Sequence, residues 1–190
     1  MRRLPLLLLV ALAVAVAGCR HQSELPKLFP VPNATLTTDG GRPLALDAMK
    51  GYVTVYDFIF TNCGGSCPLM SQTMRQLTKK IDKDAPVRFV SISVDPARDT
   101  PAALTAYAKH VRNDDRWLFL TGDRDTIVKL SVDGFKLAAG GAPQPGAEPL
   151  LHSAKFAVVD KSGVVRDYYG ATEPDAVAHV TGAVNDLLRE

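Results

Sequence analysis

The strongest constraint on the fold is a continuous apolar run, Tyr52–Phe60, that leads directly into a pair of cysteines and then a helix. The β-branched and aromatic residues of this run predict a strand that is buried on both faces. Cys63 and Cys67 follow it, and Pro68 suits the first turn of the helix predicted over 68–81, because proline has no N–H to leave unpaired. Ligand and redox sites collect at the carboxyl ends of strands in such sheets, so this loop is the candidate functional site.

The remaining sequence alternates predicted strands and helices. Strands are predicted over 87–94, 117–120, 154–159 and 164–168, and helices over 101–111, 123–130 and 173–188. A hairpin is predicted over 35–46, and the stretch 138–151 is rich in Ala, Gly and Pro, which predicts a long loop. This order predicts an α/β, thioredoxin-like fold with an extra N-terminal β-hairpin and a long loop before the C-terminal β-hairpin.

Composition places the chain among ordinary globular proteins, with 46% hydrophobic and 22% charged residues in a length of 190. The formal net charge is +2, and it falls to zero if Arg2 and Arg3 are removed with a signal segment. The sequence has no cluster of lysine and arginine of the kind that nucleic-acid binding requires, so we expect no nucleic-acid partner. We expect a single folded domain over 33–190.

The N-terminus has the pattern of an export signal. Two arginines precede an apolar run over 4–17, which is shorter than the roughly 20 residues of a membrane-spanning helix. The run ends in a Gly–Cys pair at Cys19, which resembles the lipobox of bacterial lipoproteins; an ordinary signal peptide with a chance cysteine is the alternative. We expect a lipoprotein signal peptide over 1–18, lipidation of Cys19, and a tether over 19–32. The protein would then be membrane-anchored and face the periplasm.

Two cysteines separated by three residues can take part in two kinds of chemistry. They can form a disulfide, which needs β-carbons about 3.8 Å apart, or they can bind one soft metal ion as thiolates. On a regular helix the four-residue offset places β-carbons about 5–6 Å apart, which suits a metal, but Gly64 and Gly65 keep both states open. We expect the helix N-terminus to favour the thiolate of Cys67. A purely structural disulfide between Cys63 and Cys67 is a further alternative.

Four blocks of sequence together resemble the Sco/SenC family of copper-binding, thioredoxin-like proteins. They are Phe60-Thr61-x-Cys63-x-x-x-Cys67-Pro68, the segment Ser91–Pro101, the segment Trp117–Gly122, and His152-Ser153 before a predicted strand. The blocks occur in order, and the resemblance covers nearly all of 33–190. One departure is Gly64-Gly65-Ser66, where many members of the family carry Pro-Asp or a similar polar insert.

The resemblance favours a metallochaperone that serves cytochrome c oxidase over an enzyme. By it, Cys63, Cys67 and His152 would bind copper, as Cu(I) or Cu(II), and the two cysteines would also form a redox pair. The protein would help deliver copper to, or reduce, the dinuclear copper site of oxidase subunit II or another copper-dependent protein. A copper-donor chaperone and a thiol reductant would be its other partners. The residue types agree, since two thiolates and one imidazole suit copper in either oxidation state.

Two aspartates are candidates for supporting roles beside the cysteines. Asp57 interrupts the apolar strand six residues before Cys63, and thioredoxins have a buried aspartate at that offset from their first cysteine. By this resemblance Asp57 would tune thiol ionisation or relay a proton; the alternative is an acid hydrogen-bonded at a strand edge. Asp95 follows the next strand and is expected to lie near the metal, behind its ligands. Asp99 or Thr100 is expected to cap the following helix, and Asp99 is also expected to hydrogen-bond within its own loop.

The alternative function is a thiol–disulfide oxidoreductase that acts on partner cysteines without a copper-delivery role. The spacing disfavours it, because thioredoxins have two residues between their cysteines, and it leaves His152 unexplained. A peroxidase is disfavoured because Thr61 stands at the wrong offset from Cys63. We expect His110 and His179 to be surface residues of helices, and His21 to be part of the tether.

Overall fold

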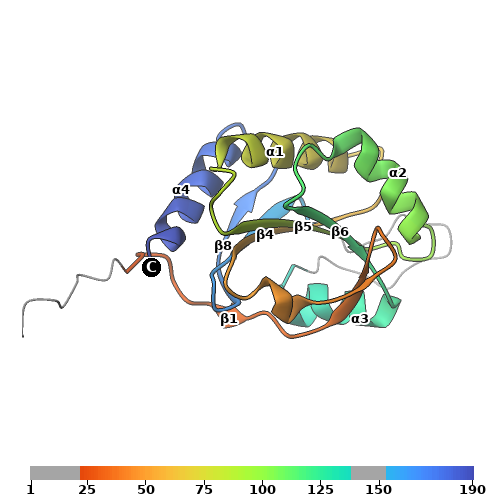
Figure 1. Cartoon of the computed structure of the whole chain (residues 1–190), viewed down its shortest axis with the longest axis horizontal. Helices are drawn as coiled ribbons and strands as arrows, with labels where there is room; N and C mark the ends of the chain where they lie inside the picture. Colours follow the sequence, from red (N-terminus) through yellow and green to blue (C-terminus); the bar gives the residue numbers. More distant parts are fainter. Residues whose placement is uncertain (1–21, 138–152) are drawn as a thin grey trace, which may run out of the picture.

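One mixed sheet forms the centre of the structure, a computed structural model that describes residues 22–137 and 153–190 (Figure 1). Its strands are β1 (Phe29–Pro30), β2 (Thr35–Thr38), β3 (Pro43–Ala45), β4 (Val53–Ile59), β5 (Val87–Ser93), β6 (Trp117–Thr121), β7 (Lys155–Val159) and β8 (Val164–Gly170). Their order across the sheet is β1–β8–β7–β4–β5–β6–β2–β3.

Helices cover both faces of the sheet. They are α1 (Cys67–Lys80), α2 (Pro101–Val111), α3 (Arg124–Lys129) and α4 (Ala176–Leu188), with a 3-10 turn over Leu46–Met49 and a π-helical turn over Leu130–Gly134. Helices α1, α2 and α4 lie on one face and α3 lies on the other (Figure 1). In the two described stretches, no helix combines the length and the apolar character needed to cross a membrane.

The parallel centre of the sheet positions the candidate site. Strand β4 pairs with β5, and β5 pairs with β6, all in parallel, while α1 and α2 make the connections. The register places Ile59 beside Ser93, so β4 and β5 end at the same level of the sheet. The loop from β4 into α1 and the loop from β5 into α2 therefore leave the sheet side by side. Open α/β sheets normally bind their ligands at this edge.

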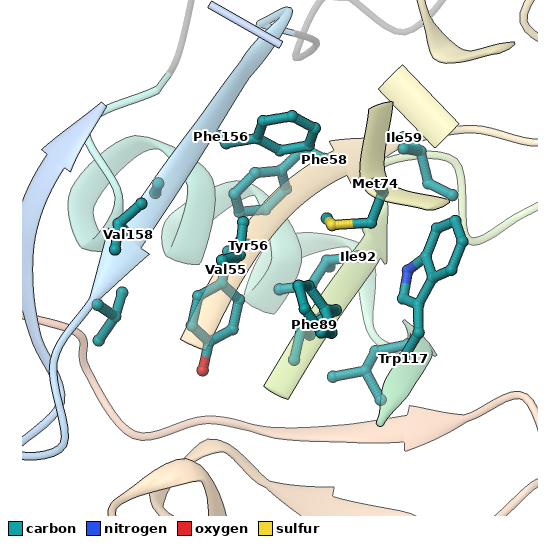
Figure 2. Close-up of a cluster of buried hydrophobic side chains, with 14 of the residues drawn as sticks. Val55, Tyr56, Phe58, Ile59, Met74, Phe89, Ile92, Trp117, Phe156 and Val158 are labelled. Atoms are coloured by element: carbon teal, nitrogen blue, oxygen red, sulfur yellow. The ribbon is translucent and has the colours of Figure 1, made fainter. Parts of the chain in front are cut away.

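The two faces of β4 pack against different layers. Tyr56 and Phe58 contact the ring of Phe135, just after the π-helical turn, with ring centroids 4.9 and 5.3 Å apart. Because side chains alternate along a strand, Asp57 between them faces the opposite layer, that of α1. Met74 of α1 is completely buried in that layer, as its place in the predicted apolar stripe requires, and Figure 2 shows it within the hydrophobic core.

The alternation of strands and helices predicted from the sequence is observed, with ends displaced by a few residues. The N-terminal hairpin is β2–β3 and the C-terminal hairpin is β7–β8. Gly41 in the turn between β2 and β3 has φ of 76°, a conformation in which glycine avoids the strain of a side chain. Helix α4 begins at Ala176, later than the predicted 173, and the π-helical turn and β1 were not predicted. The long loop predicted over 138–151 lies outside the described residues.

Part of the segment expected to be a tether is built into the domain. The main-chain N–H groups of Leu28 and Val31 each donate at 2.9 Å to carbonyls of β8 or the turn before it, which makes β1 an edge strand. The guanidinium of Arg166, 1% exposed, donates to two further carbonyls of the same segment. Residues 23–31 therefore pack on the sheet. Proline content suggested a linker, but the partners of this segment lie far away in sequence, where composition cannot reveal them.

Candidate metal and thiol site

The two cysteines lie in the connection between β4 and α1 and at the start of α1. Cys63 is half-buried in the connecting loop, and Cys67 is the first residue of α1 and 1% exposed. Both are free thiols. Pro68 occupies the first turn of α1, as predicted. A Cβ built on Gly65 would lie 3.9 Å from the sulfur of Cys63, so the loop passes close beside that sulfur.

Burial controls the ionisation of Cys67. It raises the pKa of the Cys67 thiol to about 12, and a hydrogen bond with Cys63 also raises it, while a backbone hydrogen bond at Phe60 acts in the opposite direction. The prediction that the helix N-terminus makes Cys67 a thiolate is therefore wrong. Desolvation of an almost inaccessible sulfur outweighs the helix dipole, which acts on the same group. Cys67 is a neutral thiol at physiological pH, and Cys63 is the accessible member of the pair.

Asp57 is completely buried on the α1 side of β4. Neither of its carboxyl oxygens has a hydrogen-bond partner of ordinary geometry among the described residues. Burial raises the pKa of Asp57 to about 7, and an interaction with the side chain of Ser91 on β5 offsets this only in part. The charge of Asp57 adds to the larger effect of burial in raising the pKa values of Cys67 and Tyr107. Since β4 is a central strand, Asp57 does not lie at a strand edge, and its interaction with Ser91 is made to the neighbouring strand β5.

A second buried aspartate, Asp99, connects the cysteine loop to the loop after β5. Its Oδ2 accepts the Thr61 N–H at 3.0 Å and the Ser93 hydroxyl at 2.5 Å, and its Oδ1 accepts the Thr61 hydroxyl at 2.5 Å. Thr100, not Asp99, caps α2 by accepting the N–H of Ala103. This connection between the two loops was not predicted from the sequence. The available signal was a hydroxyl residue at the end of each of two neighbouring strands, Thr61 and Ser93.

Asp95 lies in the same loop and is 9% exposed. Its carboxylate pairs with Arg98, and its N–H donates to the Ser93 hydroxyl oxygen at 3.0 Å. The Asp95 carboxylate therefore pairs with Arg98. The hydrogen bonds between this loop and the cysteine loop are made by Asp99.

The described residues contain two of the three predicted copper ligands. His152 and Cys19 lie outside the described ranges. Over 22–137 and 153–190, no three His, Cys, Asp or Glu side chains gather closely enough to hold a metal ion. His110 on α2 and His179 on α4 are exposed, as predicted. Within the described ranges, Cys63 and Cys67 are the thiols that can serve as soft metal ligands.

Strand β7 returns the chain to the cysteine edge of the sheet. It runs antiparallel to β4, and Ala157 is the partner of Tyr56. Because β7 runs antiparallel to β4, residues 153–154, which precede it, lie toward the end of β4 from which the cysteine loop leaves.

Comparison with known proteins gives a consistent relationship over the folded part. A model of the SCO1/SenC family matches residues 31–188. The SCO1 protein homolog of Bacillus subtilis (strain 168) is 36% identical over 154 residues, 79% of this chain and 79% of the relative. The structure of a SCO1/SenC family lipoprotein from Bacillus anthracis str. Ames has a TM-score of 0.77 at 30% identity, covering 87% of this chain and 99% of that one. BsSco, a member of the Sco family of cytochrome c oxidase assembly proteins with a disulfide switch, has a TM-score of 0.76 at 31% identity, covering 88% and 98%.

Relatives solved with copper bound share the fold. ScoI of Bradyrhizobium japonicum is one, with a TM-score of 0.65 at 24% identity over 84% of this chain and 99% of that one. At this identity the likeness concerns the fold alone. The predicted thioredoxin-like architecture is confirmed by the structural neighbours as a group. With a family model matched over most of its length and a relative above one-third identity, this chain belongs to the SCO1/SenC family.

Proposed function

We propose that this protein binds copper outside the cytoplasm through Cys63, Cys67 and His152, and that it serves the dinuclear copper site of cytochrome c oxidase. It would either deliver the metal to that site or reduce it. The observation that carries the proposal is a pair of adjacent free thiols at the carboxyl end of the central strand, in a chain of the SCO1/SenC family. The description of its relative BsSco as belonging to a family of oxidase assembly proteins supports the same process.

The chemistry of the donors fits copper as cargo. Two thiolates are soft ligands, and an imidazole completes a set that suits copper in both oxidation states. Cys63 is half-buried and Cys67 is buried, so a metal would approach from the side of Cys63. Because Cys67 is a protonated thiol with a pKa of about 12, binding would release its proton. Affinity should therefore fall as the pH is lowered.

The same two sulfurs couple metal loading to redox state. A disulfide between Cys63 and Cys67 would remove both thiolate ligands, so the protein must be reduced before it binds copper. This requirement gives the expected partners their roles. A thiol reductant would keep Cys63 and Cys67 reduced, and a copper-donor chaperone would supply their copper. Oxidase subunit II or another copper-dependent protein would receive the metal.

Anchoring at Cys19 would set where this chemistry takes place. The lipobox-like sequence supports lipidation of Cys19 after removal of residues 1–18. Since residues 23–31 pack on the sheet, the tether proposed over 19–32 shortens to the few residues before Ser23. The domain would then stand close to the membrane surface on its periplasmic side.

Asp57 and Asp95 would support the site without binding the metal directly. For Asp57 we propose the tuning of thiol ionisation, supported by its burial and by the effect of its charge on Cys67. For Asp95 we propose a weaker role in shaping the neighbouring loop, supported by its pairing with Arg98. Copper spectra that stay unchanged in Asp95→Ala would remove that role.

A thiol–disulfide oxidoreductase is the second candidate, and one observation favours it. An accessible Cys63 beside a buried, protonated Cys67 is the arrangement expected of an attacking and a resolving cysteine. Partner disulfides would be reduced through a mixed disulfide at Cys63, which Cys67 then resolves, leaving Cys63–Cys67 oxidised. This activity would need neither copper nor His152.

Copper titration of the reduced protein separates the two functions. We expect one tightly held copper per chain, with thiolate-to-copper charge transfer visible by absorption and a matching electron paramagnetic resonance signal. His152→Ala should lose that charge-transfer band or shift it strongly. Any shortened form should keep residues 23–31, because they pack on the sheet.

The matched control is His110→Ala, since His110 is an exposed histidine on α2. It should bind copper as the wild type does. If His152→Ala and the wild type gave the same spectra and affinity, the three-ligand proposal would be wrong, and thiol exchange would become the better description.

A further inference from the structure

We infer that Asp99 is a positioning residue for the cysteine pair: it fastens the start of the cysteine loop to the end of β5 and so holds Cys63 in place relative to Cys67. The inference rests on the proposed function of those two cysteines. The hydrogen bonds found for the Asp99 carboxylate in the described residues come from Thr61 and Ser93, not from a thiol. Asp99 acts through Thr61, which stands two residues before Cys63.

The hydrogen bonds around Asp99 are matched to a carboxylate. Three donors converge on it: the Thr61 N–H, the Thr61 hydroxyl and the Ser93 hydroxyl. The Ser93 oxygen also accepts the N–H of Asp95 at 3.0 Å, which leaves its single proton directed at Asp99. An ionised carboxylate has only acceptors, so all three bonds are satisfied at once. Bonds to an ionised group are shorter and stronger than neutral ones, and the two hydroxyl contacts are 2.5 Å long.

Asp99 is well placed to hold the loop because it is itself held. It is 1% exposed, and its N–H donates to the Asp95 carbonyl at 2.8 Å in a tight turn that leads straight into the cap of α2. The last main-chain bond between the neighbouring strands joins the Val94 N–H to the Ile59 carbonyl at 2.9 Å. Beyond it the Asp99 carboxylate continues the connection between the two loops as far as Thr61.

The need for such an anchor follows from the loop that comes next. Gly64, Gly65 and Ser66 separate the cysteines, and a Cβ built on Gly64 would meet nothing within 4 Å, so the two glycines leave the backbone of the loop weakly constrained. A metal held between two sulfurs requires a set separation, whereas a disulfide requires the sulfurs to close to bonding distance. Anchoring Thr61 restrains the loop in the open dithiol arrangement. Releasing it should weaken copper binding and make the disulfide easier to form.

The test compares Asp99→Ala with a matched aspartate in the full-length protein. Asp160 is also buried and accepts hydrogen bonds from Ser162 N–H, the Ser162 hydroxyl and Val164 N–H at 2.9, 2.6 and 3.1 Å, and a fourth from the guanidinium of Arg166 at 3.1 Å. It follows β7 at the opposite end of the sheet, where Val159 pairs with Thr54. Asp160→Ala therefore reports the cost of removing a buried turn aspartate far from the cysteines, including the loss of its ion pair with Arg166.

Three quantities are measured for each variant: the dithiol–disulfide equilibrium constant in glutathione buffers, the Cu(II) dissociation constant, and the melting temperature. Asp99→Ala should favour the disulfide by about fivefold, equivalent to about 20 mV for a two-electron couple. Its Cu(II) dissociation constant should rise about tenfold, as is typical when a group that orients a ligand is removed. Asp160→Ala should lower the melting temperature but leave both equilibria within about twofold of the wild type.

Conservative variants separate positioning from folding. Asp99→Asn keeps one acceptor for the Thr61 N–H and the Ser93 hydroxyl, and its amide can donate to the Thr61 oxygen, so it should stay close to the wild type. If Asp99→Ala does not fold, Thr61→Val removes one of the three bonds and should shift the thiol equilibrium, while Thr61→Ser should restore it.

The proposal is overturned if the folded Asp99→Ala protein stays within about twofold of the wild type, or if Asp160→Ala shifts the thiol equilibrium equally. In the Thr61 series it is overturned if Thr61→Val and Thr61→Ser behave alike. A wild type that binds no copper would instead refute the proposed function, and the thiol equilibrium would still decide the role of Asp99.

Discussion

Two buried ionisable groups in this protein have opposite surroundings. Arg166 is 1% exposed, and every N–H of its guanidinium has a partner: the carboxylates of Asp160 and Glu190 and two main-chain carbonyls of residues 25–26. Asp57 is just as deeply buried, but both of its carboxyl oxygens lack a partner of ordinary geometry among the described residues. The first site joins the two ends of the folded chain, and the second lies beneath the cysteines.

The comparison shows how one can tell a structural charge from a functional one. Around Arg166 the attraction of its partners offsets the cost of burial, so the group stays charged and holds elements together. For Asp57 the interaction with Ser91 offsets the cost of burial only in part, and burial raises its pKa to about 7. An acid that changes its charge near neutral pH beside two thiols can influence their chemistry, whereas a saturated ion pair cannot.

The largest expected effect concerns stability as a function of pH. Asp57 has a folded pKa of about 7 against an ordinary 3.8, so the native protein keeps a proton that the unfolded chain releases. The contribution of Asp57 to stability is complete below about pH 4 and is lost as the pH rises to about 7, a change on the order of 4 kcal/mol. Asp57→Asn cannot ionise and should not show this loss. Urea denaturation of both proteins across this pH range measures the difference.

The useful quantity is the unfolding free energy of Asp57→Asn minus that of the wild type. It should increase with pH between about 4 and 7, whatever constant cost the amide adds. Parallel curves for the two proteins would mean that Asp57 ionises as freely in the folded protein as in water. The contrast with Arg166 would then disappear.

Removal of the paired charge should have a somewhat smaller effect on stability. Arg166→Met leaves Asp160 and Glu190 without their partner and should lower the free energy of unfolding by about 3 kcal/mol. The side chain of Glu190 is 22% exposed and can regain water, which keeps the effect below that of a fully enclosed pair. Denaturation at neutral pH measures the loss.

Arg189→Met is the control for Arg166→Met, because Arg189 pairs with Asp186 at the surface. It should change stability by less than about 1 kcal/mol. Copper binding by folded Arg166→Met should match the wild type; a large loss of affinity would show that the two regions are coupled.

The smallest effect is electrostatic and is measured at the thiol. The charge of Asp57 adds to burial in raising the pKa of Cys67. In a Cys63→Ser background, Asp57→Asn should therefore speed the alkylation of Cys67 at about pH 9 by roughly threefold, which corresponds to about half a pKa unit. Arg166→Met should leave the rate unchanged. Equal rates with and without the Asp57 charge would remove its proposed role in thiol tuning.

Prediction from sequence succeeded where the signal is local. The apolar run that became β4, the stripe containing Met74 on α1, and Pro68 in the first turn are patterns within a few neighbouring residues. They depend on the geometry of a single strand or helix, so the alternation of elements could be predicted. The cysteine spacing and the family resemblance could be recognised in the same way.

Prediction failed where an outcome depends on what packs against a residue. The helix dipole at Cys67 could be inferred from position, but the greater effect of its burial could not. The composition of residues 23–31 predicts a linker, because their main-chain partners on β8 are distant in sequence. Capping of α2 or hydrogen bonding within its own loop could be predicted for Asp99, but its bonds to Thr61 of the cysteine loop could not.

The sequence by itself determined the order of strands and helices, the position of Cys63 and Cys67 after a buried strand, and membership of the SCO1/SenC family. Only the tertiary structure decided which cysteine is accessible, that Asp57 is completely buried, and that the Asp99 carboxylate accepts hydrogen bonds from Thr61. The physical reason is the range of the interactions. Helix and strand patterns act between close neighbours, whereas Asp99 meets Thr61 across 38 residues and Arg166 meets Pro26 across 140. Desolvation and hydrogen bonding at such separations exist only after the sheet has brought the loops together.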